Sequence, residues 1–250
     1  MANQAKFKVG YISDVHIEFQ HREIAIPVPV DAVVVAGDLD VEPARCASAL
    51  KQLQRDAGVP VLYVLGNHEY YQRRFPHALD EYRGALRDIQ GVHLLERESF
   101  IVGGVRFLGT TLWTDLSVPA EAAVARDGLN DFRIVRGMTT DSWTEEWGRC
   151  AGWLDDELKV DHPGPTVVVT HHSPSATTCA EEYRTSPLRY AFHSHTDGLI
   201  NNRNVDLWIY GHDHKSATHS HGSTKLASNQ TGYPHEQNEP VVAVACLETT

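Results

Sequence analysis

The sequence predicts an α/β fold in which buried strands alternate with helices. Three observations support this class. Short apolar runs recur along the chain, several of them end at glycine or aspartate, and the stretches between them are polar and helix-like. Apolar runs of this length are typical of strands that are buried on both faces. A chain of 250 residues, 42% of them hydrophobic, is long enough for one domain with a sizeable core.

The first half of the chain is expected to alternate strands and helices. Helices are expected at residues 43–56, where Pro43 suits the first turn, and at residues 75–89. Gly103-Gly104 suits the tight turn of a hairpin between two later strands. The strands expected in this half are residues 7–13, 33–36, 59–65, 92–95, 99–102 and 105–108.

The second half departs from this alternation before returning to it. Residues 113–160 contain several helix-like pieces and no clear strand, which predicts a helical insert or cap within a single domain of residues 1–250. Strands resume at residues 167–170 and 207–210. Residues 225–227 and 241–247 are expected to close a second sheet.

Five of the expected strands lead into side chains that can bind a metal ion. The carboxyl ends of strands are where open α/β sheets bind their ligands, so we expect these side chains to gather along one rim. The set combines imidazole, carboxylate and amide oxygen, which favours Mn, Fe, Zn or Co over Ca. In chain order the candidate ligands are Asp14, His16, Asp38, Asn67, His171, His212 and His214.

The spacing within the set suggests two ions. Asp14 and His16 are one residue apart, so on leaving a strand they point to the same side and reach one ion. His212 and His214 repeat this spacing and could diverge to different ions. Asp38 follows a glycine as a lone carboxylate and could bridge two ions with its two oxygens. Two adjacent divalent ions point to hydrolysis of a phosphate ester.

Each motif alone has an ordinary alternative. Asp-x-His at a strand end is often a capped turn, and Gly-Asp is a common turn. Histidines in polar stretches, such as His219 and His221, are typically solvated loop residues. The prediction therefore depends on the joint occurrence of these ligand types at successive strand ends in this order.

With these motifs in hand, the chain resembles the calcineurin-like metallophosphoesterase superfamily, most closely its compact bacterial single-domain members. That superfamily has the pattern D-x-H, G-D, G-N-H-[ED], H and G-H-x-H. The resemblance implies a four-layer αββα sandwich with two mixed β-sheets. The matching words here are Asp14-Val15-His16, Gly37-Asp38, Gly66-Asn67-His68-Glu69, Thr170-His171-His172 and Gly211-His212-Asp213-His214.

The resemblance also implies roles for these residues. His68 matches the catalytic histidine, which faces the substrate, and His68 and Asn67 are the expected substrate-binding residues. His172 is the alternative to His171 as a ligand. The cofactor implied is a pair of divalent transition-metal ions, with Mn favoured. One ion would be held by Asp14, His16, Asp38 and His214, and the other by Asp38, Asn67, His171 and His212.

The mechanism expected from this arrangement is attack on phosphorus by a hydroxide that bridges the two ions. His68 would donate a proton to the leaving alkoxide or hydrogen-bond a phosphoryl oxygen in the transition state. The expected substrate is a small phosphate mono- or diester. The alternatives are a cyclic-nucleotide phosphodiesterase, a nuclease, or an inactive binding scaffold. The stretch Gly37–Pro43 contains no arginine, which disfavours a protein phosphatase.

Some neighbouring residues have open roles. Glu69 and Asp213 lie inside the motifs, where they either orient ligating imidazoles or face solvent. Residues 130–133 either reach over the site or form an ordinary loop between helices, and the same two interpretations apply to Ser194 and His195.

Composition narrows the partners. The net charge of −11 disfavours nucleic acid as a partner, and no apolar stretch approaches the ~20 residues of a membrane span. The start of the chain lacks the apolar run of a signal peptide. Cys46, Cys150, Cys179 and Cys246 are scattered and form no CxxC pair, as expected of free thiols in a reducing compartment. We therefore expect a cytoplasmic protein, and the oligomeric state stays open.

Overall fold

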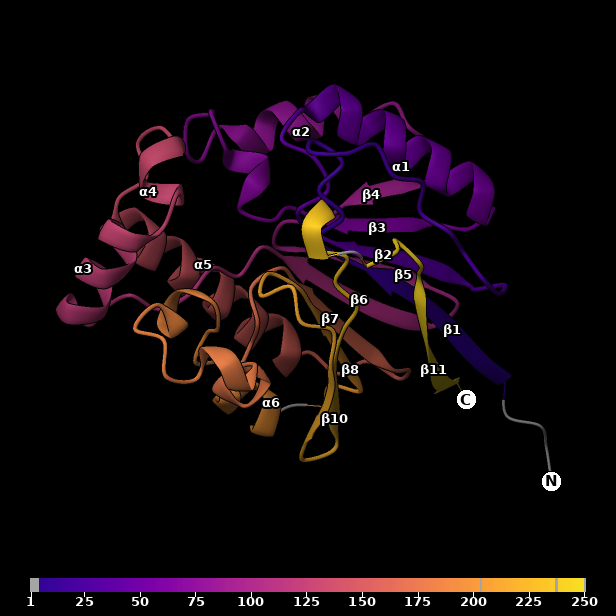
Figure 1. The fold of residues 1–250 in the computed structure, drawn as a ribbon. Helices are drawn as coiled ribbons and strands as arrows, with labels where there is room; N and C mark the ends of the chain where they lie inside the picture. Colours follow the sequence, from indigo (N-terminus) through magenta and orange to yellow (C-terminus); the bar gives the residue numbers. More distant parts are fainter. Residues whose placement is uncertain (1–4, 203, 237, 250) are drawn as a thin grey trace.

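The structure, a computed structural model, describes residues 5–202, 204–236 and 238–249. Two sheets lie face to face, and helices cover both outer sides (Figure 1). The first sheet has the order β11-β1-β2-β3-β4 and consists of β1 (Ala5–Ile12), β2 (Ala32–Ala36), β3 (Val61–Val64), β4 (Val92–Leu94) and β11 (Ala243–Thr249). The second has the order β5-β6-β7-β8-β10-β9 and consists of β5 (Glu98–Val102), β6 (Val105–Thr110), β7 (Thr166–Thr170), β8 (Leu207–Tyr210), β9 (Thr218–His221) and β10 (Thr224–Ser228).

The helices complete the layers. Helices α1 (Pro43–Ala57) and α2 (Ala78–Leu86) lie over the first sheet, and α5 (Thr140–Lys159) and α6 (Asp197–Asn202) lie over the second (Figure 1). The shorter helices are α3 (Pro119–Gly128), α4 (Asp131–Ile134) and the 3₁₀ turns η1 (His68–Tyr70), η2 (Ala176–Thr178), η3 (Glu181–Tyr183), η4 (Arg189–Ala191) and η5 (Pro234–Glu236).

Strand β2 shows why its residues form a buried strand. All five of its residues are buried, and successive side chains point to opposite faces. Val33 and Val35 pack against the helices of the outer layer, whereas Val34 and Ala36 pack between the two sheets. A strand that is apolar at every position is therefore the form required between two hydrophobic layers.

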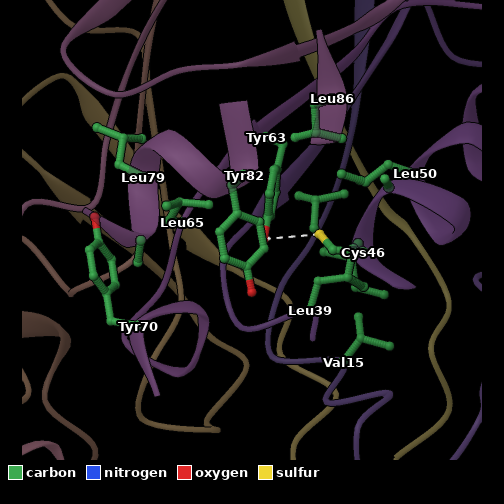
Figure 2. Packing of buried hydrophobic residues seen from close by; sticks show 14 of the residues in the cluster. Val15, Leu39, Cys46, Leu50, Tyr63, Leu65, Tyr70, Leu79, Tyr82 and Leu86 are labelled. Carbon is green, nitrogen blue, oxygen red and sulfur yellow. Dashed lines mark hydrogen bonds between the residues drawn. The ribbon is translucent and has the colours of Figure 1, made fainter. Parts of the chain in front are cut away.

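The core under α1 and α2 is shown in Figure 2, where Leu50, Tyr63, Tyr82 and Leu86 are among the residues that fill the space between helix and sheet. The Cys46 thiol donates a hydrogen bond to the Tyr63 hydroxyl at 3.3 Å. The core on the other side of the molecule is equally apolar, with Leu154 of α5 in the same cluster as the β-strand residues Leu108, Val168 and Trp208. The predicted four-layer αββα sandwich with two mixed sheets is thus confirmed.

The hairpin predicted at Gly103-Gly104 is present. Val102 pairs with Val105 across the turn, and both glycines have positive φ, 57° and 77°. A two-residue turn with positive φ at both central positions matches the twist of the flanking strands.

One strand assignment was wrong. The strand expected at residues 241–247 does not close the second sheet, because β11 pairs antiparallel with β1 in the first sheet, with Ala243 opposite Tyr11. The chain leaves β10, pairs Gln230 with Ser13 and Val241 with Ala25, and so returns to the free edge of β1. An apolar run identifies a strand but not the edge that it joins.

The segment 113–160 is helical, as expected, and forms α3, α4 and α5. Its last helix packs on the outer face of the second sheet, and Trp113 and Trp143 extend the core of the first sheet. The division into a single domain with an inserted segment stays a prediction. Within the described part of the chain, no helix combines the length and the apolarity needed to cross a membrane.

Candidate active site

The predicted ligands lie where the strands β1, β2, β3, β7 and β8 end. Asp14, His16, Asp38, Asn67 and His171 are buried. His212 and His214 are partly buried and follow the end of β8. The side chains form two adjacent groups of donor atoms.

The first group contains both residues of the Asp-x-His motif. Nε2 of His16 lies 3.0 Å from Nε2 of His214, and Nε2 of His214 lies 3.7 Å from Oδ1 of Asp14. Oδ2 of Asp38 lies 3.7 Å from Nε2 of His16. These are the four residues expected to hold one ion.

The second group lies on the other side of Asp38. Nε2 of His171 lies 3.0 Å from Oδ1 of Asn67 and 3.2 Å from Nδ1 of His212. Oδ1 of Asp38 lies 3.5 Å from Nε2 of His171. The two oxygens of Asp38 therefore face different groups, as a bridging carboxylate requires.

The donor set fits cations. Three of the imidazoles place Nδ1 within hydrogen-bond distance of an acceptor. Nδ1 of His16 lies 3.0 Å from Glu18, and Nδ1 of His214 lies 2.8 Å from Glu236. Nδ1 of His171 lies 2.9 Å from the Ala36 carbonyl. Because only Nδ1–H can donate to these acceptors, each Nε2 carries a lone pair. Two Nε2 lone pairs facing each other at 3.0 Å repel unless a cation lies between them. Carboxylates and carbonyls behind histidine ligands commonly set the tautomer in this way.

The protonation states agree with this arrangement. Burial lowers the pKa of His16 and His171, and burial together with the neighbouring His172 lowers that of His212. These rings are therefore neutral at neutral pH, which is the form that binds metal. Burial, followed by the charges of Glu69 and Asp14, raises the pKa of Asp38. A carboxylate in that setting is stabilised by nearby positive charge.

The backbone at the strand ends is left-handed at most of these residues. Asp14, His16, Asp38, His212 and His214 all have positive φ, between 51° and 85°. The expectation that Asp14 and His16 converge through the alternation of an extended strand was therefore wrong in its cause, because both residues have left-handed backbone where the strand has already ended. Non-glycine residues in this region cost about 1–3 kcal/mol each and cluster at functional sites.

Gly37 shows how tightly the site is built. Its φ is 87°, and a Cβ atom there would lie 2.5 Å from Nδ1 of His171 and 2.7 Å from the Gly66 nitrogen. Any side chain at residue 37 would push His171 away from its donor group. Glycine before Asp38 is thus required by both conformation and space.

His171, and not its neighbour, joins the donor groups. The His172 ring packs against Trp113 and Trp143, with ring centroids 5.1 and 5.5 Å apart. Nδ1 of His172 faces the Thr111 carbonyl at 3.3 Å, and its Nε2 is buried without a hydrogen-bond partner among the residues that the structure describes. The geometry favours His171 of the two alternatives.

His68 lies beside the donor groups without joining either. Its Nδ1 lies 2.9 Å from Oε1 of Glu18, and its Nε2 lies 4.0 Å from Oδ2 of Asp38. Its ring stacks on Tyr71, with centroids 4.2 Å apart, and its Nε2 lies 3.4 Å from the Tyr233 hydroxyl. Nε2 is therefore the nitrogen that faces the space beside Asp38.

Four of these neighbours were missed by the sequence analysis: Glu18, Tyr71, Tyr233 and Glu236. Burial raises the pKa of Glu18, but the hydrogen bonds from His16 and His68 outweigh it and lower the pKa to about 2. The only local signal was the position of Glu18, two residues after His16. Tyr233 and Glu236 come from the turn after β10, whose position beside His214 is a tertiary feature.

Segment 130–133 reaches the site, whereas Ser194 and His195 do not join the donor groups. Asp131 of segment 130–133 is buried and accepts a hydrogen bond from the Tyr71 hydroxyl at 3.4 Å, so that segment does reach the edge of the site. Ser194 accepts a hydrogen bond from the indole of Trp147 in α5, and the His195 ring lies near Tyr190, so contacts outside the two donor groups account for both residues.

Asp213 and Glu69 are not solvent-facing. Asp213 is buried and accepts a hydrogen bond from the side-chain amide of Gln230 at 2.6 Å. Glu69 is also buried, and its carboxylate accepts from the backbone nitrogens of Asp38, Leu39 and Gly66. It thus joins the loops that carry two of the motifs, and it also accepts from the Tyr63 hydroxyl at 2.7 Å.

Replacing Glu69 with alanine is expected to lower the free energy of unfolding by about 3 kcal/mol or more. Several buried donors would lose their acceptor, at ~1–3 kcal/mol each. Urea denaturation of the metal-free protein measures this. Glu145→Ala, at an exposed ion pair with Arg149, is the control and should change stability by less than ~0.5 kcal/mol. Equal stability of the two variants would contradict the role of Glu69.

A separate acidic cluster already contains its own cation. Glu96, Glu146 and Cys150 are buried close together. The Arg97 guanidinium donates to both carboxylates, at 3.3 Å to Glu96 and at a very short distance to Glu146. This cluster is therefore a buried ion-pair network and not a second metal centre.

Comparison with known proteins agrees with this fold. The family model of calcineurin-like phosphoesterases matches residues 7–216. An uncharacterised protein of Acanthamoeba polyphaga mimivirus is 25% identical over 201 residues, which are 71% of this chain and 70% of that protein. The chain therefore belongs to the calcineurin-like phosphoesterase family. It is a metal-dependent hydrolase of phosphoester bonds.

Solved structures share the fold. The phosphopantetheinyl hydrolase of Mycobacterium tuberculosis superimposes with a TM-score of 0.75 at 21% identity, covering 93% of this chain and 92% of that one. A putative 5'-nucleotidase from Staphylococcus aureus superimposes with a TM-score of 0.54 at 14% identity, and this chain covers 53% of its length.

Proposed function

We propose that the protein hydrolyses small phosphate mono- or diesters at a binuclear metal centre. The observation that carries the proposal is the position of Asp38, whose two oxygens lie 3.7 and 3.5 Å from ligand nitrogens of two different donor groups. The proposed ligands are the seven side chains of these groups: Asp14, His16, Asp38, Asn67, His171, His212 and His214. A pair of divalent ions held there would supply an activated, bridging hydroxide and neutralise the phosphoryl oxygens.

The protein residues supply orientation and a proton. Nδ1 of His68 is engaged by Glu18, so Nε2 is the nitrogen available to the ester. With a second proton on Nε2, so that the ring is an imidazolium beside the Glu18 carboxylate, it can donate that proton to the leaving oxygen or hydrogen-bond a phosphoryl oxygen, and it is left as the neutral ring protonated on Nδ1. Asn67 also lies at the edge of the substrate space, where its amide nitrogen contacts the Tyr71 hydroxyl at 3.4 Å.

The metal is proposed to be a transition metal of the set Mn, Fe, Zn and Co, with Mn favoured. Four imidazole nitrogens together with carboxylate and amide oxygens suit these ions better than Ca. A polymeric nucleic acid is disfavoured as substrate by the net charge of −11.

The test is a substrate panel measured with each metal in turn. Metal-free protein would be supplied with Mn, Zn, Fe or Co and assayed on 4-nitrophenyl phosphate, bis(4-nitrophenyl) phosphate, 3',5'- and 2',3'-cyclic nucleotides, and single-stranded DNA. We expect turnover of small esters with at least one metal and none after chelation. Metal-independent turnover, or turnover of the DNA alone, would contradict the proposal.

Metal binding is also expected to stabilise the fold. In the metal-free protein, the Nε2 lone pairs of His16 and His214 face and repel each other. Burial also disfavours the ionised carboxylate of Asp38. At a Mn concentration 100 times its Kd, the free energy of unfolding should rise by about 2.7 kcal/mol for each ion. Thermal melting with and without chelator measures this, and a melting temperature that does not respond to any of the four metals would contradict it.

A further inference from the structure

We infer that Glu18 is a positioning residue. A single oxygen of its carboxylate orients both the proposed metal ligand His16 and the proposed proton donor His68. The inference deepens the proposed function and rests on it. Oε1 of Glu18 lies 3.0 Å from Nδ1 of His16 and 2.9 Å from Nδ1 of His68. The two rings lie edge to face, with centroids 4.5 Å apart.

The surroundings of Glu18 show that these rings are its main partners. The side chain is 6% exposed, and the second oxygen, Oε2, is buried without a hydrogen-bond partner among the described residues. No lysine or arginine among the described residues forms an ion pair with the Glu18 carboxylate. A buried carboxylate normally needs a charged or hydrogen-bonding partner. Here the two imidazoles take that place.

The shared oxygen sets the orientation of both rings. With Nδ1–H of each ring donated to Glu18, the two Nε2 atoms point away from the carboxylate. Nε2 of His16 then faces Asp38 at 3.7 Å and Nε2 of His68 faces the same oxygen at 4.0 Å. A rotation of His68 would break its hydrogen bond to Glu18 and uncouple the proton donor from the ligand ring.

Glu236 offers a matched comparison. Its Oε2 lies 2.8 Å from Nδ1 of His214, so it supports a ligand ring in the same manner as Glu18 supports His16. No hydrogen bond or ion pair joins it to His68 within the described residues. Replacing Glu236 therefore disturbs only a ligand ring, His214. Replacing Glu18 disturbs a ligand ring, His16, and also the proposed proton donor, His68.

The test compares esters with good and poor leaving groups at saturating Mn. Methyl and 4-nitrophenyl esters would be used, as monoesters or diesters according to which the wild type hydrolyses. A poor leaving group needs protonation, and the nitrophenolate does not. In Glu18→Ala, kcat for the methyl ester is expected to fall ~10²-fold, and kcat for the nitrophenyl ester less than ~5-fold. Glu18→Gln, which keeps an acceptor oxygen, should recover most of the loss.

Two further variants make the result specific. In a His68→Ala background, Glu18→Ala should not change the ratio of the two kcat values any further. Glu236→Ala should weaken Mn binding and leave the ratio as in the wild type. A ratio unchanged by Glu18→Ala, or changed equally by Glu236→Ala, would overturn the inference.

A measurement without turnover separates this inference from the proposed function. In the metal-free protein, imidazole ¹⁵N shifts should show Nδ1 of both His16 and His68 protonated and hydrogen-bonded, and Glu18→Ala should abolish the hydrogen-bond signature at Nδ1 of both rings. Wild-type protein that hydrolyses no ester would defeat the proposed function. Nδ1 signals of His16 and His68 that do not respond to Glu18→Ala would defeat the positioning role instead.

Discussion

Replacing His68 with alanine is expected to lower kcat by ~10²–10⁴-fold while both metal ions stay bound. Nε2 of His68 lies 4.0 Å from Oδ2 of Asp38. Within the donor groups, the shortest distances between proposed ligand atoms are 3.0 Å. Removal of the His68 imidazole therefore takes away a proton donor but no ligand. Kinetics at saturating Mn, with elemental analysis of the same sample, measure both halves of this prediction.

The control is His77→Ala. The His77 side chain is 68% exposed and lies just before α2, so its loss should change neither kcat nor metal content. Full activity in His68→Ala would remove this residue from the mechanism. Loss of one metal equivalent would instead make His68 a ligand. The backbone nitrogen of His68 donates to Asp38 at 2.9 Å, and this hydrogen bond survives the substitution.

The sequence was most informative at the ends of strands. Valine-rich runs such as Val33–Val35 can be recognised because a strand buried on both faces must be apolar at every position. Each run then stops at a polar motif, so the position of the ligands along the sheet edge follows from the strands themselves. The family pattern added a prediction of which ligands belong together. That assignment stays a prediction, and the distances around Asp38 are the observation from which the bridge is proposed.

Other features depend on tertiary packing and had no signal of their own. The edge that β11 joins is decided by the return of the chain past Ser13 and Ala25, not by its own apolar run. The left-handed backbone at Asp14 and His16 is imposed by the loops that Glu69 and neighbouring backbone groups hold in place. Glu236 lies 22 residues after His214, so no spacing rule connects the two.

Replacing Asp38 with asparagine is expected to abolish activity through loss of metal. The amide has one oxygen and no charge, so it can face only one of the two donor groups as an acceptor. Even carboxylates that merely support metal ligands contribute 10–100-fold to affinity, so loss of the bridge should cost more than ~10²-fold. Isothermal titration of the metal-free variant with Mn should show at most one weakened site.

The thermal stability of metal-free Asp38→Asn gives a second test. Burial and the charges of Glu69 and Asp14 raise the pKa of Asp38, so its ionised form destabilises the metal-free fold at neutral pH. A carboxyl group whose pKa is raised in the folded state favours folding less as the pH rises and the group ionises. A neutral amide of the same shape removes that penalty. Metal-free Asp38→Asn should therefore melt no lower than metal-free wild type at pH 7.

The control for this variant is Asp40→Asn, two residues further along the same loop. Asp40 is buried, but its carboxylate accepts from Arg45 at 2.9 Å and from the Glu42 backbone, away from both donor groups. This control should keep both metals, respond to added Mn as the wild type does, and hydrolyse the same esters. Should Asp38→Asn also bind two Mn ions with wild-type affinity, a carboxylate bridge cannot be what holds the pair. A metal-free melting temperature well below that of the wild type would show instead that Asp38 is needed for packing, and would separate structural damage from loss of the bridge.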